Sequence, residues 1–149
     1  MRFFLIQIVG YFGIKLEQLS IIEDKNFGFH YRRQVLKIGK KTAMITKKAV
    51  YNNVELFRYM GTYHWIVNKQ RKALKYWTKS IAEGERMGAR PELARTYFEV
   101  GRRLLEKTSG HKALNGIKAE DYLQRAKTMF EGMDLKWDLE QLERFTSNI

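Results

Sequence analysis

One stretch decides the fold of this chain: MGTYHWIVNKQRKALKYWTKSI, residues 60–81. It consists of two largely apolar segments, 60–67 and 72–81, separated by a polar break at residues 68–70. Within each segment the apolar side chains recur every three or four residues, which is the period of a helix that buries one face. The stretch therefore predicts two helices joined by a tight polar turn.

Small and large residues alternate in a way that would let these two helices interlock. Trp77 lies between Ala73 and Ser80 on one helical face, and large side chains pack well against small ones. Gly61 lies in the middle of the other helix, where glycine costs about 1 kcal/mol relative to alanine. Close approach by a neighbouring helix would offset that cost.

The same pattern recurs farther along the chain. Gly101 follows Gly61 by 40 residues, and the second helices are related by a shift of 46. The matched positions of the repeat are Gly61 with Gly101, Ala73 with Ala119, Trp77 with Leu123, and Ser80 with Ala126. The extra residues form a loop at 111–118. Two helix pairs, at about 53–88 and 91–134, are predicted to bury their faces by stacking.

The remaining segments extend this all-α plan. A helix is expected at residues 30–50, although Gly39 could interrupt it, and a capping helix at 137–146. The segment 1–29 has no clear period and is left unassigned, so the expected repeat domain covers residues 30–149. Hydrophobic residues make up 44% of the chain, which favours a folded core, and a single proline argues against a fold with many turns.

The repeat positions resemble those of a tetratricopeptide-type repeat. The residues that carry the resemblance are Phe57, Met60-Gly61, His64, Asn68, Ala73, Trp77 and Ser80. The resemblance implies antiparallel helix pairs stacked as a short right-handed α-solenoid that binds other proteins. GTYHW (61–65), KALKYW (72–77) and GARPELARTYFEVG (88–101) are also similar to the helical tails of large bacterial nucleotide-cyclase/ATPase signalling proteins. That similarity implies a part in signal transduction.

The geometry of the family suggests a partner-binding groove. The residues expected to line it are Arg58, Thr62, Trp65, Arg95, Phe98 and Arg102. The arginines would hold carboxylates of an acidic protein or peptide, with the two aromatic rings as apolar anchors. The alternative is that these side chains pair with Glu55, Glu99 and Glu106 or pack on the preceding helix pair.

The motifs of common enzymes are not found in the sequence. It has no glycine-rich phosphate loop, no nucleophile elbow and no metal-binding pair of histidines. His64 falls on the predicted buried stripe, where a core role is the simpler interpretation. We therefore expect a non-enzymatic protein without a cofactor, a scaffold or interaction module.

Charge suggests a second class of partner. The net charge is +12, and the whole excess lies between residues 30 and 90. A nucleic acid would meet this block through Arg32, Arg33, Lys40, Lys41, Lys47 and Lys48. The simpler alternative is a set of solvated helix faces.

Two further expectations concern association and location. Apolar ends of a short solenoid would favour a homodimer. The apolar run at residues 3–14 is too short to span a membrane, and the lack of cysteine fits a cytoplasmic protein.

Overall fold

The computed structural model describes residues 2–22, 25–46 and 53–149. In these ranges the chain forms seven helices and a hairpin of two very short strands, so the predicted all-α class is confirmed. The helices belong to two compact units, a first unit Met1–Tyr76 and a second unit Trp77–Ile149. Stacking of the helix pairs as a solenoid stays a prediction.

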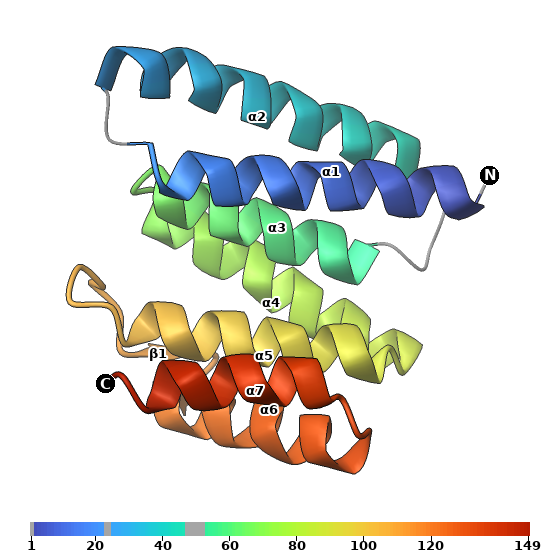
Figure 1. Ribbon diagram of the computed structural model, residues 1–149, viewed down its shortest axis with the longest axis vertical. Helices are drawn as coiled ribbons and strands as arrows, with labels where there is room; N and C mark the ends of the chain where they lie inside the picture. The colour runs from blue at the N-terminus through green and yellow to red at the C-terminus, as the bar shows by residue number, and fades with distance from the viewer. Residues whose placement is uncertain (1, 23–24, 47–52) are drawn as a thin grey trace. The chain divides into compact units, whose positions relative to one another are not determined.

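The first unit is built on three helices that contact one another, α1 (Arg2–Ser20), α2 (Lys25–Thr46) and α3 (Asn53–Ile66) (Figure 1). Their buried side chains form one apolar core: Phe12, Leu16, Leu19, Val35, Leu56, Met60 and Tyr63. The polar break is found where the sequence predicts it, because α3 ends at Ile66 and α4 (Gln70–Met87) begins four residues later. The first turns of α4 supply Tyr76, whose ring stacks on His64 at a centroid distance of 5.2 Å.

Helices occupy most of the segment that the sequence left unassigned. α1 covers residues 2–20, and α2 begins at Lys25 rather than at about residue 30. Gly39 does not interrupt α2. A Cβ at this position would lie 2.8 Å from Phe12 Cζ and 2.9 Å from Met60 Sδ, so the glycine lets side chains of α1 and α3 reach the backbone of α2. Residues 47–50, the predicted end of this helix, lie outside the described residues.

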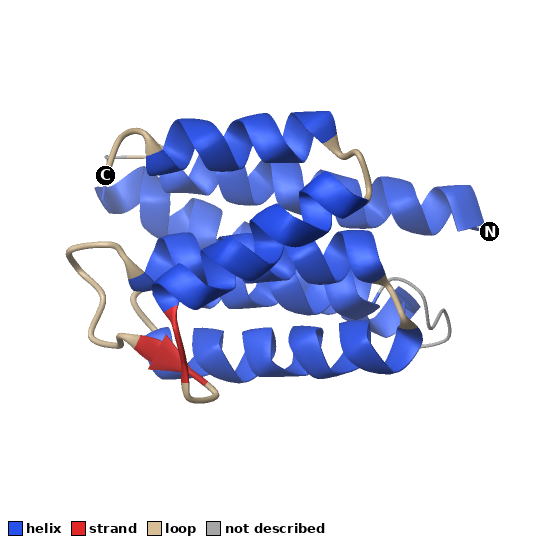
Figure 2. Cartoon of the chain, turned by 90° about the horizontal axis from the view of Figure 1, so that it is seen from below, coloured by secondary structure: helices blue, strands red, loops and turns tan. Residues whose placement is uncertain are grey.

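The second unit contains the rest of α4, together with α5 (Arg90–Leu104), β1 (Ala113–Leu114), β2 (Ile117–Lys118), α6 (Ala119–Gly132) and α7 (Lys136–Thr146). Figure 2 shows the antiparallel hairpin as the two strands before α6. Asn115 and Gly116 form its turn, both with positive φ, as a two-residue type I′ turn requires. The Tyr122 hydroxyl donates to Leu114 O at 3.0 Å and attaches the hairpin to α6.

The repeat positions are all buried, and two contacts show how the second unit packs. A Cβ on Gly101 would lie 2.8 Å from Leu123 Cγ and 3.0 Å from Ala119 O, so α5 and α6 approach closely at this glycine. Ser80 on α4 shares a buried hydrogen bond of 2.9 Å with Thr96 on α5. Four of these residues are completely buried: Ala73, Trp77, Ser80 and Ala126.

Candidate binding surfaces

Three of the predicted groove residues, Arg58, Thr62 and Trp65, lie on α3 in the first unit. The Arg58 guanidinium pairs with Glu55 at 3.6 Å and lies 4.6 Å from the centre of the Tyr59 ring. The Thr62 hydroxyl donates to Arg58 O at 3.1 Å, within the helix. Trp65 is only 5% exposed. Their side chains therefore already have contacts within the protein.

The other three lie on one face of α5 in the second unit. Arg95 donates to both carboxylate oxygens of the buried Asp138 on α7, at 2.8 and 3.0 Å, and this hydrogen bonding raises the pKa of the guanidinium. The Phe98 ring meets Phe130 and Phe145 edge-on, at centroid distances of 6.4 and 6.1 Å. The contacts with Asp138 and Phe145 join α7 to α5, and the contact with Phe130 joins α6 to α5.

Arg102 belongs to an ion-pair network on the same helix. Both Arg102 and Arg103 donate to the buried carboxylate of Glu99, and Arg103 also pairs with Glu106 at 2.6 Å. Burial disfavours the charge of Arg103, but Glu99 and Glu106 outweigh it and raise the pKa of this guanidinium. These pairings are of the kind that the sequence offered as the alternative to a groove. The partner-binding role of the six residues stays a prediction.

A different surface carries exposed cations. α2 contains no Asp or Glu, and one of its faces presents Arg33, Lys37, Lys40 and Lys41 to solvent. We call these four residues, with Phe29 and Met44 on the same face, the cationic face. None of its four cations pairs with a carboxylate in the described part of the chain. Lys47 and Lys48, which the sequence also proposed for phosphate binding, lie outside the described residues.

Two large apolar side chains are exposed to solvent on this face. Phe29 is 62% exposed and Met44 77% exposed. The Arg33 guanidinium lies 5.8 Å from the centre of the Phe29 ring, and His30 is hydrogen-bonded to Gln34 at 3.0 Å. Sequence reasoning missed Phe29, Lys37 and Met44 as site residues. Their common face could have been found from their spacing of three and four residues along the helix.

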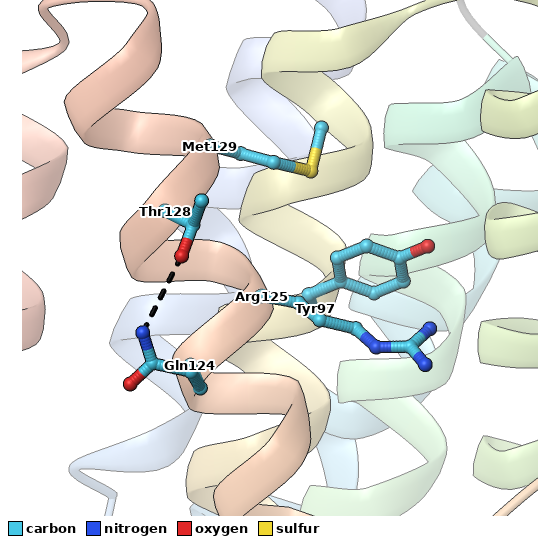
Figure 3. Close-up of a pocket in the computed structure, with 5 residues that line it drawn as sticks. All are labelled: Tyr97, Gln124, Arg125, Thr128 and Met129. Carbon is cyan, nitrogen blue, oxygen red and sulfur yellow. Dashed lines mark hydrogen bonds between the residues drawn. The ribbon is translucent and has the colours of Figure 1, made fainter.

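A small hollow of about 260 Å³ lies in the second unit. Figure 3 shows its lining residues, which are Tyr97, Gln124, Arg125, Thr128 and Met129. The Tyr97 hydroxyl donates to Glu85 at 3.2 Å, and burial raises the pKa of this phenol. The exposed lining of this hollow is mainly apolar.

His64 is buried, as the sequence predicted for this position. Its ring stacks on Tyr76 and meets the Tyr63 ring edge-on, and its Nδ1 has no hydrogen-bond partner among the described residues. Burial, together with the charges of Lys72 and Lys69, lowers the pKa of His64 to about 4. The imidazole is therefore neutral near pH 7.

Metal ligation and membrane crossing find no support in the described residues. In the ranges that the structure describes, no group of three or more His, Asp or Glu side chains is placed to hold a metal ion. The helices in these ranges also lack the combination of length and apolar character needed to cross a bilayer. Comparison with protein-family models, curated proteins and solved structures gave no match.

Proposed function

We propose that this chain is a non-catalytic module that binds nucleic acid, with phosphate groups held on the cationic face of α2. One observation carries the proposal. Arg33, Lys37, Lys40 and Lys41 are exposed together on a helix that has no acidic residue. By contrast, the arginines at positions 95, 102 and 103 of the second unit are held by carboxylates of the same unit.

The distribution of charge between the two units supports this assignment. The first unit has 15 basic and 4 acidic residues, whereas the second has 13 basic and 12 acidic residues. A one-sided positive field attracts polyanions and speeds their encounter with the protein. The charge excess therefore belongs to the unit that contains α2.

A phosphate backbone fits this face better than a bilayer does. A helix that lies in a membrane interface uses a continuous apolar face, but the apolar face of α2 is buried in the core of the first unit. Phe29 and Met44 are 15 residues apart, about 22 Å along the helix, with the four cations between them. The outward face is thus a row of cations with one apolar group near each end.

The protein-binding groove expected from the sequence has weaker support. Its arginines have carboxylate partners within the protein, and Trp65 is buried. A ligand would have to replace these ion pairs before it could use the same guanidinium groups. The scaffolding role in signalling and the homodimer remain predictions from the repeat.

The test removes three lysines from the face. In Lys37→Gln/Lys40→Gln/Lys41→Gln, affinity for a fluorescent oligonucleotide is measured by anisotropy at salt concentrations between about 50 and 200 mM. Four phosphate contacts on a single strand predict a log–log slope of about −3, a loss of about 60-fold over this range, and the triple variant should reduce the slope by about 2.

The matched control is Lys107→Gln/Lys112→Gln/Lys118→Gln. It removes the same charge from three exposed lysines of the second unit and should keep the wild-type slope. Equal slopes for the two triple variants would show that only net charge matters and would refute the proposed site.

A further inference from the structure

The Phe29 ring contributes little to the packing of the first unit. It is 62% exposed at the N-terminal end of the cationic face, whereas the core side of α2 is formed by buried residues such as Val35 and Thr42. The guanidinium of Arg33, one turn further along, lies 5.8 Å from the centre of the ring. An exposed aromatic ring therefore adjoins a row of cations that have no carboxylate partner in the described part of the chain.

We propose that the cationic face binds single-stranded nucleic acid, with one base stacked on the Phe29 ring. This inference rests on the proposed function and adds the class of nucleic acid. The flat face of a base is accessible in a single strand, but in a duplex it is covered by the neighbouring base pairs. Stacking on an aromatic side chain, combined with a cationic groove or row for the backbone, is the usual way to hold a single strand.

The positions along α2 are suited to this arrangement. Lys40 follows Phe29 by 11 residues, which places the two about 16 Å apart along the helix axis. Arg33 and Lys37 lie between them on the same face. A base on the ring would thus be followed by phosphates near successive cations, and Arg33 would also contact the base by cation–π interaction.

Phe29→Ala tests the stacking, since the exposed ring can be removed without opening the core. Three probes of equal length, about 16 nucleotides, are compared by anisotropy at constant salt: a single strand, its duplex and an abasic single strand. Phe29→Ala should weaken the affinity for the base-bearing single strand by about 5- to 100-fold. Binding of the abasic strand and the salt slope should not change.

Ile14→Ala is the matched control. Ile14 is 55% exposed on α1 of the same unit, outside the cationic face, and its removal should leave all three affinities unchanged. Phe29→Tyr, which keeps an aromatic face, should retain the preference for the base-bearing strand.

A spectroscopic readout detects the stacking directly. Trp65 and Trp77 are buried and Trp137 is exposed. In Phe29→Trp/Trp137→Phe, the introduced indole is therefore the exposed one. Its emission should be quenched by the base-bearing strand and not by the abasic strand.

The outcomes separate the inference from the proposed function. Equal binding of both single strands, or tighter binding of the duplex with no effect of Phe29→Ala, overturns the stacking and leaves the cationic face intact. If no nucleic acid binds and vesicles containing phosphatidylserine do, both the inference and the proposed function are overturned.

Discussion

The contact between α5 and α6 at Gly101 allows a quantitative prediction. In Gly101→Ala, the added Cβ would lie 2.8 Å from Leu123 Cγ and 3.0 Å from Ala119 O. Neither atom is the far end of a flexible side chain, so the Leu123 side chain or the helix backbones must shift to make room. Overpacking of this kind costs about 1–3 kcal/mol, whereas alanine gains about 1 kcal/mol over glycine in helix propensity. The free energy of unfolding should therefore fall by about 1 kcal/mol.

Gly10→Ala provides the control with the opposite sign. Gly10 also lies inside a helix, but no atom would come within 4 Å of the added Cβ. Only the gain in propensity remains, and the protein should become more stable by about 0.5–1 kcal/mol. Urea unfolding followed by circular dichroism measures both variants. The midpoint should fall by about 0.5 M for Gly101→Ala and rise for Gly10→Ala.

A double-mutant cycle isolates the clash. Leu123→Ala alone should cost about 2–5 kcal/mol, because it leaves a cavity. In Gly101→Ala/Leu123→Ala the new methyl group occupies part of that space, so the double variant should be more stable than the sum of the single changes by about 1 kcal/mol. If Gly101→Ala stabilises the protein as much as Gly10→Ala does, the close approach of α5 and α6 is refuted.

Two further predictions concern buried polar groups. The pKa of His64 is about 4 in the folded protein and about 6.5 in an unfolded chain. As the pH falls, the unfolded chain therefore takes up a proton first. The free energy of unfolding should decrease between about pH 6.5 and 4, by up to about 1.4 kcal/mol per pH unit. His64→Phe keeps the ring and should remove this part of the slope in urea unfolding at about pH 7 and 5; an unchanged slope would assign it to other groups. Asp138→Ala breaks the pair with Arg95 and should lower the free energy of unfolding by about 2 kcal/mol, with faster amide hydrogen exchange in α7. Glu140→Ala removes a partner of an exposed pair and should change this free energy by less than about 0.5 kcal/mol. Equal exchange in these two variants would contradict the role of Asp138.

The helices of the central stretch and the turn between them could be predicted from the sequence because both depend on local features. The apolar period of 54–67 and the polar residues 68–70 predicted α3, α4 and the turn between them. Residues 3–14 were harder, because nearly every position in this run is apolar or glycine, and such a run shows no helical period. Its packing on α2 and α3 decides its structure.

Ion pairing explains why the groove could not be assessed from residue types. Glu99 and Arg102 are three residues apart, a spacing at which helical side chains meet, so this pair could be expected. The pair of Arg95 and Asp138 spans 43 residues and depends on how α7 packs against α5. A sequence with an arginine on a helix face thus indicates a cation, but only the structure shows whether a carboxylate already holds it.

The same question, whether a carboxylate already holds each cation, can be asked of α2. Because it has no acidic residue, its cations cannot be neutralised by neighbours one turn away, and only another element could supply a carboxylate. In the described residues none does so for Arg33, Lys37, Lys40 or Lys41. Like charges on one face repel one another and destabilise the helix by a few tenths of a kcal/mol per pair. A polyanion would relieve this repulsion, so binding to α2 should stabilise the first unit as well as hold the ligand.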